Sequence, residues 1–335
     1  MTTLLKLDHK SKSVQVLRAV AFLFVFLFHA FTKLGWWGAF GVSLFIVLSG
    51  YLETKKHLYD DISALPFAIK KIKKVCPLHI IMMLFAIPLS AKIALKRHGA
   101  IKLLIQIFLN AIMAQSWVPI RAIYYSLNAV SWYLTLVVFL ALISPKLMRW
   151  LRNSSVRKIK IVVLTLICCD FIVGYLSMRL PEAHWIAYVC PVTRSFDYII
   201  GGGTYVLAHK NIKIWMLPTG LTLAIGMLIS SAFADFTNEL FSSALWIIPS
   251  VLIIPTVTEN SLPAWQPFII LGNISFELFL IHQLIIRYLN LVLGHIVAIE
   301  SLVNKLVIAL AAFVISIGAT MLYRRISKEI IRKEI

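Results

Sequence analysis

Two side chains in the first apolar stretch, Arg18 and His29, could together bind and deprotonate a substrate. Eleven positions separate them, close to three helical turns, so both would project from nearly one face, about 16 Å apart along the axis. Histidine has an ordinary pKa near neutrality and suits a general base, whereas arginine stays protonated and suits an anion or a carbonyl oxygen. A structural role is the alternative: Arg18 would reach the inner head groups and His29 would hydrogen-bond a neighbouring helix.

Among the ionisable side chains within later apolar stretches, where desolvation is costly, three are candidates for the same site. Arg194 and Asp197 could pair with each other, or Arg194 could bind a group of the substrate. His282 could be a second histidine of the same site, or a histidine satisfied by a neighbouring helix. Trp36 and Trp37 are expected at the outer membrane interface, as interfacial aromatics without a sugar-binding role.

The composition indicates that membrane helices position these residues. Of the 335 residues, 60% are hydrophobic and 14% are charged, whereas soluble domains are about 45–50% apolar and about 25% charged. Mean hydropathy is +0.87. The net charge of +19 fits the positive-inside rule and attraction to anionic lipid, and no basic and aromatic stripe suits nucleic acid. We therefore expect a lipid-embedded protein that binds no nucleic acid.

Apolar segments long enough to cross a ~30 Å hydrocarbon layer predict an all-α, polytopic membrane bundle. Eleven candidates occur, at 14–32, 35–52, 75–91, 101–118, 127–148, 159–176, 185–208, 214–233, 240–257, 268–293 and 302–323. We expect them to form one membrane domain over residues 1–335.

The basic segments limit the number of crossings. Segments 55–74 and 149–160 are both strongly basic and should both face the cytoplasm, which allows two complete crossings between them but not three. The segment 101–118 is the weakest of the three, because it carries Gln106 and Asn110, and we expect it to be re-entrant or interfacial. About ten transmembrane helices remain, with both termini cytoplasmic.

Small residues indicate where predicted helices approach closely. Gly38, Gly41 and Gly50 lie in the second segment, and Gly201 to Gly203 lie in the segment 185–208. In membrane helices such residues let a neighbouring backbone come near, so we expect packing rather than a phosphate loop. The four cysteines lack metal-binding spacing, and no GxSxG, Walker or HExxH motif occurs. We expect neither a metal nor a covalent serine intermediate.

Five short motifs follow one another along the chain. The first combines Arg18 and His29 with the segment GVSLFIVLSGYL that begins at Gly41. The other four are KKIKKVCP with Lys70, Lys71 and Lys74, SWYL with Trp132, RSFDYIIGG with Arg194 and Asp197, and ISFELFLIHQ with His282. In this order they resemble the acyltransferase-3 family of integral membrane acyltransferases.

The resemblance implies transfer of an acyl group, expected to be acetyl, from acyl-CoA to a hydroxyl of a cell-surface or exported glycan. It also implies a multi-pass protein, expected in the bacterial cytoplasmic membrane, whose partners are membrane lipid, acetyl-CoA and the glycan. His29 would be the general base, and Arg18 would bind a phosphate or the carbonyl oxygen. Transfer would be direct or would use an acyl relay across the membrane.

The remaining motif residues are expected to bind substrate or donor. Lys70, Lys71 and Lys74 would attract the phosphates of CoA from the cytoplasmic side, although topology alone could explain their charge. The other expected binding residues are Trp132, Arg194, Asp197 and His282.

A transporter or flippase of polysaccharide or lipid-linked sugar is the alternative function. Arg18, His29 and Arg194 would then line a substrate path. The sequence shows no internal repeat of the kind many transporters have, which favours the transferase. It indicates neither the oligomeric state nor the acceptor.

Overall fold

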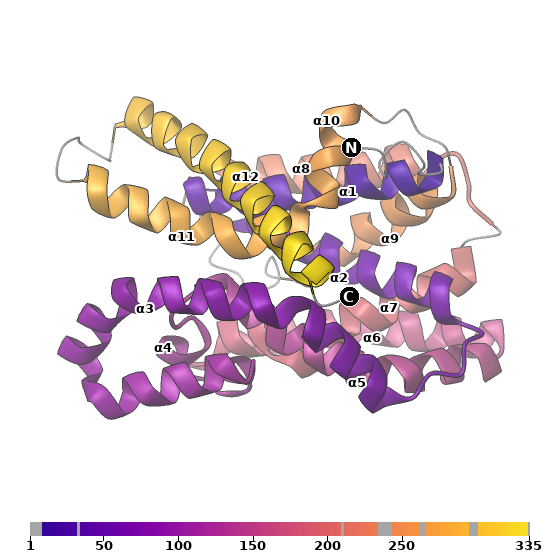
Figure 1. Cartoon of the computed structure of the whole chain (residues 1–335). Helices are drawn as coiled ribbons and strands as arrows, with labels where there is room; N and C mark the ends of the chain where they lie inside the picture. Colours follow the sequence, from indigo (N-terminus) through magenta and orange to yellow (C-terminus); the bar gives the residue numbers. More distant parts are fainter. Residues whose placement is uncertain are drawn as a thin grey trace.

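The computed structural model describes residues 9–31, 34–208, 211–233, 243–260, 265–294 and 301–333, and over these ranges every long regular element is an α-helix (Figure 1). The helices are α1 His9–Ala30, α2 Gly35–His57, α3 Ala64–Ala111, α4 Arg121–Tyr124, α5 Trp132–Asn153, α6 Val156–Ser177, α7 Pro191–Ala208, α8 Met216–Phe233, α9 Ala244–Glu259, α10 Gln266–Asn273, α11 Ser275–Leu293 and α12 Leu302–Lys333. The predicted all-α class is confirmed. The chain ends lie outside the described ranges, so their cytoplasmic placement stays a prediction.

The helices have the length and composition of membrane spans. In the described ranges, seven are long and apolar enough to cross a bilayer, and shorter apolar helices occur at Gly99–Ala111, Met216–Ser231 and Ala244–Glu259. The protein is therefore a multi-pass integral membrane protein, although this count is lower than the predicted ten crossings. Two predicted spans are interrupted: 268–293 breaks at Ile274 between α10 and α11, and 185–208 begins with a π-helical turn, Trp185–Val189.

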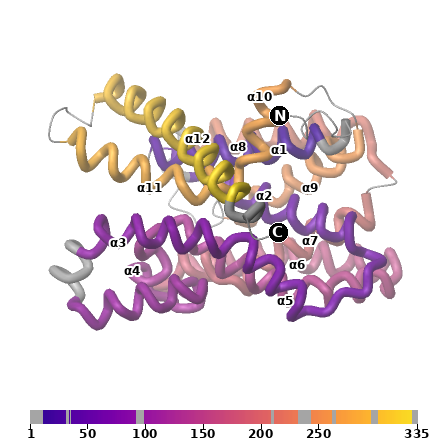
Figure 2. Tube along the Cα trace, viewed as in Figure 1, coloured from indigo at the N-terminus to yellow at the C-terminus, as the bar shows by residue number. Residues whose placement is uncertain are grey.

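Two groups of helices meet along α2 (Figures 1 and 2). In this view α1 and α8 to α12 form the upper group, and α3 to α7 form the lower group. The central helix α2 packs along α1 and α9 of the upper group and along α7 of the lower group. Residues from both groups can therefore converge near each end of α2.

Close backbone contacts hold α2 between its neighbours, as its small residues predicted. A Cβ atom at Gly41 would collide with the carbonyl oxygen of Ala21 in α1, and one at Gly50 would collide with that of Tyr198 in α7. From the other side of the crossing, a Cβ atom at Gly201 in α7 would collide with the carbonyl oxygen of Val47 in α2. These glycines serve helix packing, which confirms the prediction.

The segment 101–118 is a short helix that folds back against α3. Gly99, at a φ of +79°, breaks α3 into two arms, and the second arm ends at Ala111. Its 13 residues span roughly 20 Å, less than the ~30 Å hydrocarbon layer. The length of this arm agrees with a re-entrant or interfacial segment.

A buried polar network explains the amides of this arm. The Asn110 side chain donates to the Ser126 hydroxyl at 2.8 Å and accepts from the Ser131 hydroxyl at 3.1 Å. Gln106 donates to the carbonyl of Ala122 at 2.6 Å. Each amide is therefore satisfied by the connection leading into α5, where an isolated membrane helix would leave it without a partner.

Candidate active site

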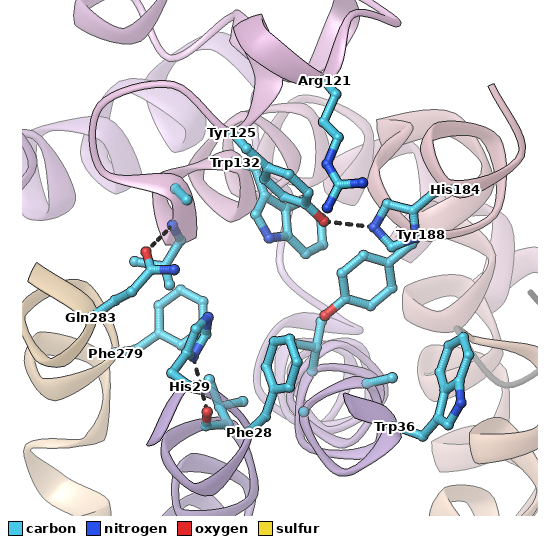
Figure 3. A pocket seen from close by; sticks show the side chains of 16 residues that line it. Phe28, His29, Trp36, Arg121, Tyr125, Trp132, His184, Tyr188, Phe279 and Gln283 are labelled. Atoms are coloured by element: carbon cyan, nitrogen blue, oxygen red, sulfur yellow. Dashed lines mark hydrogen bonds between the residues drawn. The ribbon is translucent and has the colours of Figure 1, made fainter. Parts of the chain in front are cut away.

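A cavity of about 420 Å³ lies at one end of α2, between the two groups of helices (Figure 3). His29 from the end of α1, Trp36 from the start of α2 and Gln283 from α11 form one side. Trp132, at the first turn of α5, and Tyr188, from the π-helical turn, contribute to the opposite side. The volume is within the usual range of small-molecule sites, about 300–1,000 Å³.

Two histidines meet at the wall of the cavity. Nε2 of His282 lies 3.0 Å from Nδ1 of His29, and the ring of His282 is completely buried behind it. The aromatic rings of Phe22 and Phe279 pack around His282, with centroids 5.6 and 6.3 Å from that of the imidazole. His29 is therefore the member of the pair that substrate can reach.

Backbone carbonyls determine the protonation pattern of both rings. Nδ1 of His29 lies 3.0 Å from the carbonyl oxygen of Val25, and Nδ1 of His282 lies 2.9 Å from that of Leu278. Because a carbonyl oxygen only accepts, we assign the proton of each neutral ring to Nδ1. The single Nδ1–H of His29 is then shared between the Val25 carbonyl and Nε2 of His282, which both accept from it, and Nε2 of His29 keeps its lone pair. This is the arrangement of a general base with an orienting partner.

The opposite wall contains polar side chains that the sequence motifs did not indicate. The Tyr125 hydroxyl lies 2.8 Å from Nε2 of His184, and the ring of His184 lies 5.2 Å from that of Tyr188 (Figure 3). Arg121 also lines the cavity. The indole N–H of Trp185 donates to the carbonyl of Ser116 at 2.8 Å and so anchors the π-helical turn. No sequence pattern signals such a turn, so these residues could not have been predicted.

Arg18 lies away from the cavity that contains His29. Its charge interacts electrostatically with Tyr133 of α5. The cavity lining includes His29 and Trp132 but not Arg18. The helix α1 is continuous through both residues, so Arg18 and His29 project from nearly the same face, as predicted. His29 lines this cavity and Arg18 does not.

Arg194 and Asp197 form a fully buried ion pair beneath the cavity. Nη1 of Arg194 lies 3.1 Å from a carboxylate oxygen of Asp197, and Nη2 donates to the Ser43 hydroxyl at 3.1 Å. The guanidinium also lies over the ring of Tyr188, 5.5 Å from its centroid. The sequence left open pairing or substrate binding, and the structure shows the pair, with neither residue lining the cavity.

The three predicted donor-binding lysines differ in their surroundings. Nζ of Lys71 lies 2.6 Å from Oε1 of Glu53, and the Tyr198 hydroxyl donates to Oε2 of the same carboxylate at 3.2 Å. Lys70 and Lys74 are exposed, one helical turn apart on α3. Lys71 therefore ties α3 to α2, while the other two remain accessible to an anionic ligand.

A comparison with known families identifies the chain. A sequence model for an acyltransferase domain matches residues 11–325. The protein belongs to the acyltransferase-3 family. This membrane acyltransferase is 22% identical over 275 residues to acyltransferase MdmB of Streptomyces mycarofaciens, covering 77% of this chain and 70% of that protein. No solved structure matches the acyltransferase. Within its described residues, no group of three or more His, Cys, Asp or Glu side chains is arranged to hold a metal ion.

Proposed function

We propose that this acyltransferase moves an acyl group, acetyl in the simplest case, from acyl-CoA to a hydroxyl of a cell-surface or exported glycan. The observation that carries the proposal is the histidine pair at the cavity wall. His29 presents an unprotonated Nε2 and is held by His282 through its Nδ1. This geometry supplies a base for an alcohol.

In this reaction His29 first accepts a proton from the acceptor hydroxyl and then gives it to the leaving thiolate. Nε2 of His29 takes the proton of the acceptor hydroxyl while its oxygen attacks the thioester carbonyl carbon. The resulting imidazolium is stabilised because its Nδ1–H donates to Nε2 of His282. When the tetrahedral intermediate collapses, the carbon–sulfur bond breaks and the CoA thiolate takes the proton back from His29. The products are the ester and free CoA.

The walls of the cavity suit a carbohydrate. Trp36, Trp132 and Tyr188 present aromatic surfaces, and Arg121 supplies a positive charge. The lining contains no Asp or Glu, so the acceptor can be neutral or anionic. Trp36, which was expected to have only an interfacial role, lines this cavity (Figure 3), and we propose that it also contacts the acceptor.

We place the donor on the cytoplasmic side of a bacterial cytoplasmic membrane. Lys70 and Lys74 are, with Lys73, the exposed cations of the KKIKKVCP motif and would attract the phosphates of CoA. Arg18 does not line the cavity and would bind a phosphate or the carbonyl oxygen of the donor, whereas the buried pair Arg194–Asp197 would act mainly by holding α7 against α2.

Mass spectrometry of surface glycans from expressing cells tests the proposal. Wild type, His29→Ala and a control, His57→Ala, are compared at equal membrane levels. His57 is paired with Asp60 at the end of α2 and does not line the cavity. We expect acyl increments with wild type and the control, and none with His29→Ala, at constant glycan abundance. Loss of surface glycan without loss of acylation would support the flippase instead.

A further inference from the structure

The side chain of Gln283 is fixed with its amide nitrogen free on the cavity wall. Its Oε1 accepts from the backbone N–H of Val130 at 3.2 Å. Because a backbone N–H only donates, the oxygen must face Val130 and the NH2 group must point elsewhere. Within the described chain this NH2 group has no acceptor, and Gln283 lines the cavity (Figure 3). It is one residue after His282.

Two more bonds hold the same turn against α11. The Asn128 side chain donates to the carbonyl of Leu280 at 2.9 Å. One guanidinium nitrogen of Arg287 donates to the carbonyl of Leu127 at 2.6 Å. Because Leu280 and Arg287 flank Gln283 on α11, the turn that carries Val130 is fixed against α11 on both sides of Gln283. A donor held in this way costs little reorganisation when charge develops.

A second donor without an acceptor lines the same cavity. Trp132 begins α5 two residues after Val130 and lines the cavity. Its indole N–H has no acceptor in the part of the chain that the structure describes, and an indole nitrogen can only donate. The short turn therefore fixes one neutral donor, Gln283, and leads directly into the other, Trp132, and both line the cavity that contains His29.

We propose that Gln283 donates a hydrogen bond to the acyl carbonyl oxygen during transfer, with the indole of Trp132 as a second donor. This inference rests on the proposed function. As His29 takes the hydroxyl proton and the acceptor oxygen attacks, the electron pair of the C=O bond moves onto the carbonyl oxygen. The Gln283 amide stabilises that negative charge. When the carbon–sulfur bond breaks, the pair returns and the hydrogen bond weakens.

Gln283→Glu separates this role from a structural one. Glutamate keeps an oxygen that can accept from Val130 but replaces the donor by a carboxylate, which would repel the developing charge. The assay is CoA release from acetyl-CoA by the purified protein in lipid nanodiscs, with water as acceptor, together with glycan acylation in cells. We expect kcat to fall by roughly 10²- to 10³-fold, with KM for acetyl-CoA within about threefold of wild type. Gln266→Glu, the same change at an exposed position on α10, is the control and should behave as wild type.

The alternatives give different results. Near wild-type turnover of Gln283→Glu, with an inactive His29→Ala protein, would overturn the donor role and leave the proposed function standing. Full activity of His29→Ala would overturn the proposed function itself. If Gln283→Glu does not fold, Trp132→Phe provides the test: a fall in kcat without a change in KM supports the pair of donors, and unchanged kcat refutes it.

Discussion

Nε2 of His282 lies 3.0 Å from Nδ1 of His29, although 253 positions separate the two residues in the chain. Each ring also contacts the carbonyl four residues earlier in its own helix, Val25 for His29 and Leu278 for His282. The two helices therefore fix one tautomer for each ring. The Val25 carbonyl and Nε2 of His282 together hold the proton of His29 on Nδ1 and leave Nε2 as the reactive nitrogen.

His282 should act as a positioning residue for His29. Glutamine at this position offers a side-chain oxygen near the place of Nε2, whereas leucine offers no acceptor. We expect His282→Gln to retain kcat within about tenfold and His282→Leu to lose roughly 10²-fold or more, each with unchanged KM for acetyl-CoA. Steady-state kinetics in nanodiscs give the comparison. Equal losses in both variants would show that the ring matters for packing rather than for its acceptor.

The buried pair Arg194–Asp197 should matter for stability more than for binding. Replacing only Arg194 by Met leaves an unpaired buried carboxylate and should lower the free energy of unfolding by about 3–5 kcal/mol. Combining Arg194→Met with Asp197→Leu removes both charges and should recover much of that stability. Thermal unfolding in detergent measures both variants. Arg325→Gln is the control, because Arg325 and its partner Glu329 are 81% and 61% exposed, and an exposed pair contributes about 1 kcal/mol or less. A double variant less stable than Arg194→Met would contradict the structural role.

Gly50→Ala should loosen the crossing of α2 and α7. The added Cβ would collide with the carbonyl of Tyr198, so we expect a loss of about 1–3 kcal/mol in unfolding free energy. Gly226→Ala in α8 is the matched control, since no atom lies within 4 Å of its Cβ position. There alanine should be neutral or stabilise the helix by up to about 1 kcal/mol. Intrinsic fluorescence during heating reports both changes, and equal effects would rule out the close approach.

The exposed lysines of α3 should affect donor binding in a salt-dependent manner. Lys70→Gln combined with Lys74→Gln removes two accessible positive charges. We therefore expect a several-fold higher KM for acetyl-CoA at low ionic strength. This difference in KM should shrink at higher ionic strength, because salt screens the attraction between the lysines and the CoA phosphates. Unfolding temperature should not change. Lys71→Gln should instead lower stability, because it breaks the ion pair with Glu53. Lys158→Gln, an exposed charge on α6, is the control for net charge. An unaltered KM would assign Lys70 and Lys74 to topology alone.

Hydrophobic segment lengths and small residues were sufficient to predict much of the fold. Long apolar runs predicted most of the long helices, and Gly41, Gly50 and Gly201 correctly indicated close crossings. The interruptions were not predictable in the same way. The break at Ile274 and the π-helical turn Trp185–Val189 lie within continuous apolar sequence, and tertiary contacts rather than local composition determine them.

The site was predictable only where a residue belongs to a recognisable motif. His29 and Trp132 both line the cavity, as a shared site requires. Arg18 lies elsewhere, because a shared helical face does not establish that two side chains reach the same cavity. Tyr125 and His184 were missed, since their contact depends on a turn that brings together residues 59 positions apart.

The polar network of α3 also limits the order in which the protein can enter the membrane during synthesis. The second arm of α3 carries Gln106 and Asn110, and their partners Ala122, Ser126 and Ser131 all leave the ribosome later. Until then, the two amides would face lipid without partners. This arm can therefore settle only once the chain leading into α5 has emerged. We therefore expect residues 99–131 to enter the bilayer as one unit, and truncation between Asn110 and Ser131 to leave the nascent chain exposed to quality-control proteases.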